Sequence, residues 1–216
     1  MPKSLYRAPG GFRDQLLGAV AEIKLGQPDD LSTMVTAVID NAAAERLRTA
    51  IEGARADPNS KVVAGGRVDT SKGYFVEPTV IETTDPLSAT MSTELFGPVL
   101  TVFEYDDTAA GWRWEDCLEL IDRTSPYGLT GAVFAKDRQA IAAAEKVLIN
   151  AVGNLYFNDK STGAVVGEQP FGGARASGTN DKAGSHLNLL RWVSPQTIKE
   201  TTVGITGIGY PHMRPE

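Results

Sequence analysis

The chain has 216 residues, of which 42% are hydrophobic and 22% are charged, and its 21 Lys+Arg and 27 Asp+Glu give a formal net charge of −6. This composition is that of a globular protein with a sizeable core, and it excludes a disordered chain. The acidic balance disfavours a nucleic-acid-binding protein. No apolar run approaches the ~20 residues that span a bilayer. We therefore expect neither a nucleic-acid nor a membrane partner.

The single cysteine, Cys117, excludes an internal disulfide and fits a reducing compartment. The first residues, "MPKSLYRAPGGFRD", lack the apolar centre of a signal peptide. We expect a cytoplasmic protein, or one of the mitochondrial matrix if the source is eukaryotic. Neither His186 nor His212 has a Cys, a His or an acid at metal-ligand spacing, so we expect no metal site.

The first part of the chain predicts two helices followed by short strands. Apolar residues at helical spacing place one helix over residues 11–24. A second helix follows over residues 41–56, with Asp40 as its N-cap. Two extended segments come next, and the second, residues 74–84, carries Pro78. Because proline cannot donate to a sheet ladder, we expect an edge strand or a bulge at that point.

The middle of the chain alternates strands with helices. The pattern predicts a strand over residues 98–107, a helix over 112–124, a strand over 127–135, a helix over 138–148 and a strand over 151–158. This order implies parallel strands joined by crossover helices. The expected fold class is therefore α/β, with a mostly parallel open sheet.

The alternation stops after residue 158 and is followed only by a short helix near residues 184–192. The last segment starts with alternating apolar and polar residues and has no neighbouring strand in the sequence. An isolated terminal strand is either a sheet edge or an arm that pairs with another chain. We therefore divide the chain into a domain of residues 1–193 and a C-terminal arm of residues 194–216.

Cys117 lies on the apolar stripe of the predicted 112–124 helix, flanked by Asp116 and Glu119. A catalytic thiolate needs an electropositive and partly exposed setting, whereas both acids would raise the pKa of this thiol. We interpret Cys117 as a core residue.

The stretch "NDKSTGAVVGEQPFGGARASGTNDKAG", residues 158–184, carries six glycines and no helical or strand periodicity. Gly173 and Gly178 have the glycine spacing of a P-loop, but Thr179 and Asn180 stand where that loop requires Lys and Ser or Thr. A nucleotide-phosphate site is therefore not indicated by this stretch.

Glu94 is a second candidate, in the segment "STELFGPVL" that leads into a predicted strand. A carboxylate at the edge of a parallel sheet can accept hydrogen bonds from sugar hydroxyls. It can equally be a solvated loop residue, and the residues alone leave both interpretations open.

The segments "ELFGPVL" and "PFGGARASG", separated by "YGLTGAVFA" and "AVGNLYFN", resemble the C-terminal half of the aldehyde dehydrogenase superfamily. Residues 158–184 are very similar to the signature of its L-glutamate γ-semialdehyde (Δ1-pyrroline-5-carboxylate) dehydrogenases. The resemblance extends from "PKSLY" near the start to "SPQTIKETT" near the end. It implies an NAD-dependent oxidoreductase that converts glutamate semialdehyde to glutamate in proline catabolism.

The resemblance also implies which residues bind ligands. Glu94 would hold the nicotinamide ribose of NAD, and Phe96 would pack beside that ribose. Gly173 and Ala174 would offer backbone N–H groups to the α-carboxylate of the substrate, and Phe171 would form an apolar wall beside the aldehyde. A loop that presents bare amides needs little side-chain bulk and unusual φ/ψ, which explains its glycines.

The resemblance places the nucleophilic cysteine of the family shortly before "PKSLY", with the NAD domain, the general-base glutamate and the oxyanion asparagine further upstream. This chain starts with Met1 and Pro2 at that point. We therefore expect a C-terminal portion with no catalytic residue of its own and no turnover in isolation. Its terminal arm is expected to join subunits of a homo-oligomer.

Two other functions remain open at this point: a stand-alone glutamate- or carboxylate-binding module, and a structural partner that completes a split enzyme. The role of Arg175 is also open, because this side chain either adds positive potential beside the substrate or is simply exposed to solvent.

Overall fold

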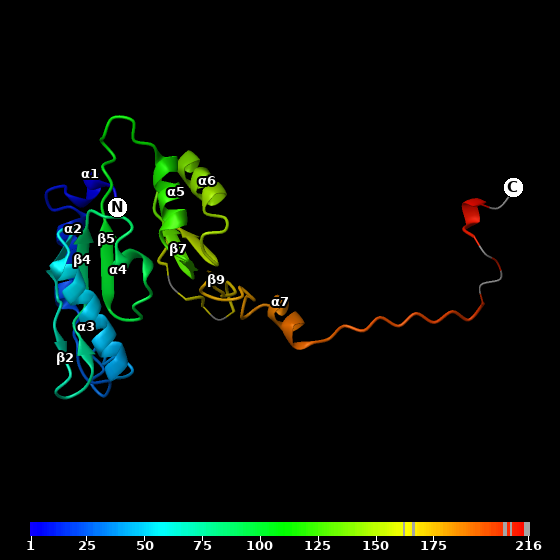
Figure 1. Cartoon of the computed structure of the whole chain (residues 1–216), viewed down its shortest axis with the longest axis horizontal. Coiled ribbons are helices and arrows are strands. Elements are labelled where there is room, and N and C mark those ends of the chain that lie inside the picture. Colours follow the sequence, from blue (N-terminus) through cyan, green and yellow to red (C-terminus); the bar gives the residue numbers. More distant parts are fainter. Residues whose placement is uncertain (162, 166, 205–206, 208, 214–216) are drawn as a thin grey trace.

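The computed structural model describes residues 1–161, 163–165, 167–204, 207 and 209–213. Figure 1 shows two lobes followed by an extended C-terminal segment. We call residues 1–111 the first lobe and residues 112–192 the second lobe. The clusters of buried apolar residues lie within one lobe or the other, so each lobe has its own core.

The first lobe has the two predicted helices, α2 (Phe12–Glu22) and α3 (Asn41–Ala56), close to their expected positions, and two short helices that were not predicted, α1 (Lys3–Tyr6) and α4 (Ala89–Ser92). The predicted N-cap of α3 is confirmed, because the Asp40 Oδ1 atom accepts a hydrogen bond from the Ala43 amide at 2.7 Å. Leu47 and Ile51 form the centre of the buried face of α3.

The main sheet of the first lobe has three strands in the order β1-β4-β5. Its strands are β1 (Ser60–Ala64), β4 (Thr79–Thr83) and β5 (Val99–Phe103), and a separate hairpin pairs β2 (Val68–Asp69) with β3 (Phe75–Val76). Strand β4 runs antiparallel to β1 and parallel to β5. Helices α2 and α3 cover opposite faces of this sheet, α2 packing near Val63 and α3 near Val62.

Pro78 does not mark an edge strand, and that prediction is wrong. The residue lies between β3 and β4, and β4 is the central strand of its sheet. Thr79, directly after the proline, donates its amide to the Pro98 carbonyl at 2.9 Å, so the ladder begins where a donor is present. The bulge of this sheet lies in β1, between Val62 and Ala64.

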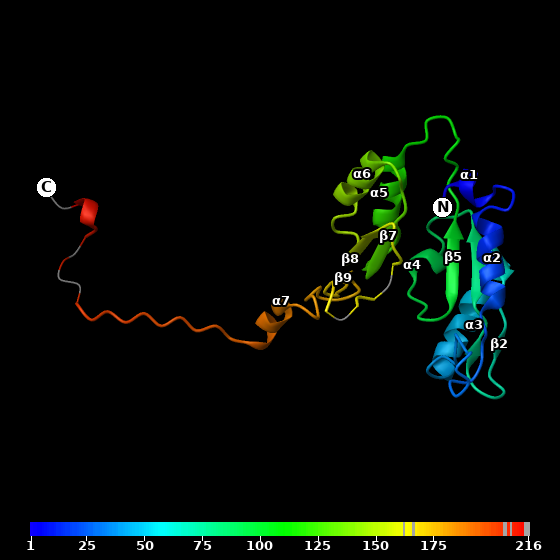
Figure 2. The same cartoon turned by 180° about the vertical axis from the view of Figure 1, so that it is seen from behind.

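The second lobe contains the predicted strand–helix–strand unit. Its elements are α5 (Trp114–Thr124), β6 (Tyr127–Gly128), β7 (Thr130–Val133), α6 (Arg138–Val147), β8 (Asn154–Phe157), β9 (Ala174–Arg175), α7 (His186–Leu189) and a 3₁₀ turn, η1 (Leu190–Trp192). Strands β7 and β8 are parallel and α6 crosses between them, as expected. Helices α5 and α6 lie beside each other, which Figure 2 shows from behind.

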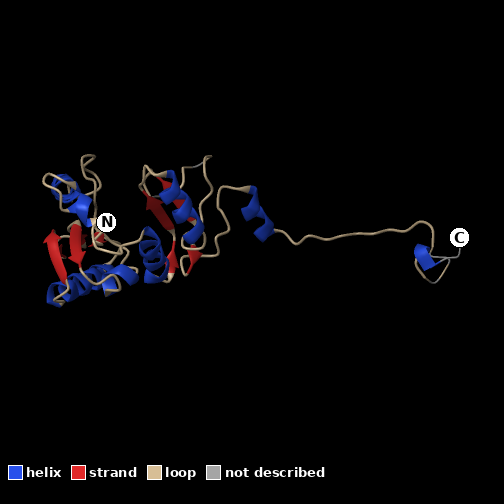
Figure 3. Ribbon diagram, turned by 90° about the horizontal axis from the view of Figure 1, so that it is seen from above, coloured by secondary structure: helices blue, strands red, loops and turns tan. Residues whose placement is uncertain are grey.

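The α/β class with parallel strands is confirmed, although the strands of the described residues form separate small sheets. Residues 193–200 run as an extended, exposed chain away from the second lobe (Figure 3). Their alternating pattern predicted a strand, but a strand requires a neighbour, and the described part of this chain offers none there. A short 3₁₀ turn, η2 (Pro211–Met213), follows. Among the described residues, no helix combines the length and apolar character needed to cross a membrane.

Candidate functional site

The Glu94 loop connects α4 to β5 and is held against α3. Arg46 of α3 donates its Nε hydrogen to the Leu95 carbonyl at 3.1 Å, and Leu95 packs on the Leu47 cluster. A Cβ atom added at Gly97 would lie 2.4 Å from the Leu47 Cδ1 atom, so any larger residue would force the buried Leu47 side chain to move. The loop is therefore fixed with Leu95 turned inward.

Phe96 and Glu94 are exposed on either side of that anchor. Phe96 has a φ of +54°, a left-handed conformation that is uncommon for an aromatic residue, and its side chain is 79% exposed. The Glu94 carboxylate makes no hydrogen bond or ion pair with any described residue. A strained backbone that presents an exposed ring and an unengaged carboxylate is typical of a ligand-binding loop.

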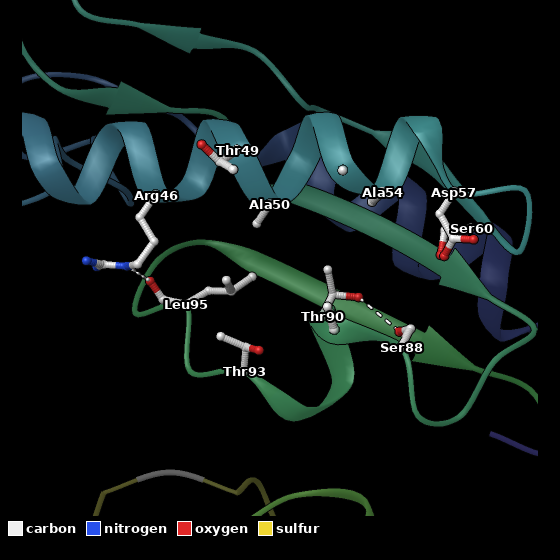
Figure 4. Close-up of a pocket in the computed structure, with 12 residues that line it drawn as sticks. Arg46, Thr49, Ala50, Ala54, Asp57, Ser60, Ser88, Thr90, Thr93 and Leu95 are labelled. Carbon is white, nitrogen blue, oxygen red and sulfur yellow. Dashed lines mark hydrogen bonds between the residues drawn. The ribbon is translucent and has the colours of Figure 1, made fainter.

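A pocket of about 410 Å³ lies between α3 and the segment that leads to this loop (Figure 4). Its walls include Arg46, Thr90, Thr93 and Leu95, but neither Glu94 nor Phe96. The pocket therefore lies beside the predicted cofactor-binding residues and does not contain them.

The glycine-rich loop of the second lobe, residues 171–183, is closed by hydrogen bonds between its ends and pairs with a neighbouring strand. Phe171 and Ala183 exchange two backbone hydrogen bonds, of 2.9 and 2.8 Å. On the other side, the short strand β9 pairs with β6, so that Ala174 lies opposite Gly128. The Gly128 amide also donates to the Ser177 Oγ atom at 3.0 Å. These ties give the loop one defined course.

Gly173 is buried at the centre of this loop. A Cβ atom there would lie 2.7 Å from the Ser177 Cβ atom and 3.0 Å from the Leu129 Cδ1 atom. The glycine is required by close approach, whereas its φ lies outside the left-handed region. The Gly172 amide donates to the Asn154 Oδ1 atom at 3.3 Å, whereas the Gly173 amide has no acceptor among the described residues. One backbone donor in the predicted carboxylate site is therefore unused.

Arg175 lies at the surface, as one of the two interpretations predicted, but its guanidinium is engaged by the protein and not simply solvated. Its Nε hydrogen bonds the Asn150 carbonyl at 2.9 Å, and its guanidinium also bonds the Asp122 carboxylate and carbonyl. The side chain is only 26% exposed. Its charge is neutralised by Asp122, so Arg175 fastens the loop to the end of α5.

Cys117 is confirmed as a core residue, with 8% exposure. Burial raises the pKa of its thiol, which keeps the sulfur protonated and unreactive at neutral pH. No group of three or more His, Cys, Asp or Glu side chains that could hold a metal ion occurs among the described residues.

The predicted site residues thus fall into two groups. Glu94 and Phe96 share a loop of the first lobe, whereas Phe171, Gly173 and Ala174 share a loop of the second lobe. Two residues that support the second loop, Asn154 and Lys182, were not predicted. The only sequence signal for Asn154 is that a polar residue opens an otherwise apolar strand.

Comparison with known proteins shows similarity along nearly the whole chain. The profile of the Aldehyde dehydrogenase family matches residues 2–198. The chain is 51% identical over 213 residues to the mitochondrial delta-1-pyrroline-5-carboxylate dehydrogenase of Dictyostelium discoideum and 47% identical over 215 residues to that of Homo sapiens. Each alignment covers 99% of this chain and 37% of the relative.

Solved structures agree with these matches. The Delta-pyrroline-5-carboxylate dehydrogenase of Mycobacterium tuberculosis superposes with a TM-score of 0.80 at 50% identity, covering 94% of this chain and 37% of that one. The same enzyme bound with NAD gives a TM-score of 0.78 at 51% identity, covering 94% of this chain and 36% of that one. The chain therefore spans little more than a third of the length of these relatives. It belongs to the aldehyde dehydrogenase family.

Proposed function

We propose that this chain forms the C-terminal part of an NAD-dependent L-glutamate γ-semialdehyde dehydrogenase, which oxidises the semialdehyde to glutamate in proline catabolism. The observation that carries the proposal is identity of about half over 99% of the chain to enzymes named delta-1-pyrroline-5-carboxylate dehydrogenase. In this proposal residues 1–193 belong to the catalytic domain and residues 194–216 form an arm that joins subunits of a homo-oligomer.

The exposed Glu94 loop suits NAD. Its carboxylate is free to accept hydrogen bonds from the two hydroxyls of a ribose, and the Phe96 ring offers an apolar face beside them. Bound NAD would supply the hydride acceptor for aldehyde oxidation. The role of this chain is to hold the ribose in one orientation.

The glycine-rich loop suits the α-carboxylate of the substrate. The unengaged Gly173 amide and its neighbour Ala174 would donate charge-assisted hydrogen bonds to the carboxylate oxygens. The Phe171 ring would form an apolar wall beside the aldehyde. The loop is fixed before a substrate arrives, so little ordering entropy is lost on binding.

The chain by itself should not turn over substrate. Aldehyde oxidation of this kind requires a thiolate that attacks the carbonyl carbon. The single cysteine is buried in a core with a raised thiol pKa. The compartment we propose is the cytoplasm, or the mitochondrial matrix in a eukaryotic source, because the eukaryotic relatives are named mitochondrial.

The test uses a hybrid enzyme in which residues 2–198 replace the matching segment of a full-length relative, measured for NADH formation from glutamate semialdehyde. We expect the hybrid to turn over at a rate close to that of the relative, and the 216-residue chain alone to show none. A hybrid that folds but oxidises only aldehydes without an α-carboxylate would refute the proposed substrate. NADH formation by the chain alone would refute the proposal that this chain does not turn over substrate by itself.

A further inference from the structure

The glycine-rich loop is supported by a polar cluster that neither the sequence motif nor the ligand contacts explain. Asn154 opens β8 directly beneath the loop. Its Nδ2 hydrogen bonds the Pro170 carbonyl at 3.0 Å, and its Oδ1 atom accepts the Gly172 amide at 3.3 Å. One side-chain amide therefore holds the backbone on both sides of Phe171.

Lys182 fixes that side-chain amide from the other direction. Its Nζ atom donates to the Asn154 Oδ1 atom at 3.3 Å and to the Gly153 carbonyl. Because Oδ1 thus receives two donors while Nδ2 faces a carbonyl, the asparagine has only one favourable orientation. An ammonium donor also strengthens the bonds in which it takes part.

The backbone around Lys182 is strained. Asn180 and Lys182 have φ values of +58° and +55°, and lysine seldom adopts this region. The strained turn passes directly over Gly172, where an added Cβ atom would lie 3.1 Å from the Asn180 Cα atom. Partial burial of the Lys182 ammonium lowers its pKa. Strain and desolvation of this kind persist only where the surrounding structure requires them.

We propose that Asn154 and Lys182 form a clamp that positions the Gly172–Ala174 backbone for the α-carboxylate of the substrate. This inference rests on the proposed function. The clamp touches neither the substrate nor the cofactor. It acts through the loop, so both are positioning residues. Without the clamp, the Gly173 amide loses its fixed direction, and the substrate α-carboxylate is bound more weakly.

The test compares two substrates in one preparation of the hybrid enzyme: glutamate semialdehyde, which carries the α-carboxylate, and propanal, which does not. For Lys182→Met we expect kcat/KM for glutamate semialdehyde to fall about tenfold, the effect of one charge-assisted hydrogen bond, mainly through KM. For propanal we expect a change of less than about twofold. Misfolded enzyme lowers both kcat/KM values equally. The ratio of kcat/KM for glutamate semialdehyde to kcat/KM for propanal therefore reports positioning alone.

Two further variants complete the design. Lys72→Met, an exposed lysine in the turn between β2 and β3, serves as the matched control and should change neither value. Asn154→Leu should lower the ratio as Lys182→Met does, and the double variant should be no worse than Asn154→Leu, because Lys182 acts on the loop through the Asn154 side chain.

If the variants lower kcat/KM equally for the two substrates, or lower neither, the ratio stays unchanged and the proposed clamp is wrong. An unmodified hybrid that makes no NADH from glutamate semialdehyde would instead overturn the proposed function, so the two failures are distinguishable.

Discussion

Replacing Gly153 with alanine will abolish oxidation of glutamate semialdehyde by the hybrid enzyme and destabilise the second lobe. A Cβ atom at this position would lie 1.8 Å from the Gly172 carbonyl oxygen, which is well inside van der Waals contact. The obstacle is backbone, so no side-chain rotation relieves it. The loop must move away from β8, and the Asn154 and Lys182 contacts with it are lost.

We expect the free energy of unfolding of the 216-residue chain to fall by about 3 kcal/mol, the upper part of the range for an overpacked site. Urea unfolding measures it. The matched control is Gly18→Ala in α2, where an added Cβ atom meets nothing within 4 Å. In a helix this change should stabilise the chain by up to about 1 kcal/mol. A Gly153→Ala hybrid with normal kcat/KM would show that the loop does not depend on this close approach.

The second large effect concerns Glu82, in β4, which joins three elements of the first lobe. Its carboxylate accepts hydrogen bonds from the Tyr6 hydroxyl at 3.0 Å, the Arg13 Nε atom at 2.5 Å and the Arg7 guanidinium at 3.1 Å. The Tyr6 side chain is fully buried and the Glu82 side chain is 14% exposed. We expect Glu82→Ala to lower the free energy of unfolding at pH 7 by about 2 kcal/mol, because three hydrogen bonds to the carboxylate are lost and Arg13 is left without an ion-pair partner, whereas Arg7 keeps Glu104.

Glu82 should also shape the acid stability of the chain. Burial of Glu82 would raise the pKa of its carboxyl, but the bonds from Arg13 and Tyr6 and the charge of Arg7 outweigh burial and lower that pKa overall. A carboxyl with a lowered folded-state pKa stabilises fully above its unfolded value of about 4.3 and loses that contribution as pH falls through the folded value. Between about pH 5 and 3, the native chain should therefore lose stability more steeply than Glu82→Gln.

Urea unfolding at several pH values measures both curves. Parallel curves for the native chain and Glu82→Gln would contradict the role of this carboxylate. Glu22→Gln, at the exposed end of α2, is the matched control and should follow the native chain.

Much of the fold could be predicted because its signals are local. Helices α3 and α6 follow from apolar spacing and from side-chain caps at Asp40 and Asp137, and both caps form. The burial of Cys117 follows from its place on an apolar stripe. Pro78 misled the prediction because the sequence shows that a donor is missing but does not show where the ladder begins.

The site was predicted less completely, because its supports are contacts between distant residues. Lys182 reaches Asn154 across 28 positions, and Arg175 reaches Asp122 across 53. No periodicity or spacing rule indicates such pairs, and each depends on a loop whose course the packing decides. Glu94 was a candidate from its place before a predicted strand, but only the resemblance to a family decided its expected role and named Phe96, since exposure and strain at Phe96 are visible only in three dimensions.

The central claim is that the backbone at Gly173 and Ala174 binds the α-carboxylate of the substrate. A crystal structure of the hybrid enzyme with L-glutamate, the reaction product, tests it most directly. We expect the α-carboxylate oxygens to lie about 2.9 Å from the Gly173 and Ala174 amide nitrogens, with the side-chain carboxylate pointing away toward the reaction centre. Glutamate bound with its α-carboxylate on other groups, leaving the Gly173 amide without an acceptor, would contradict the claim.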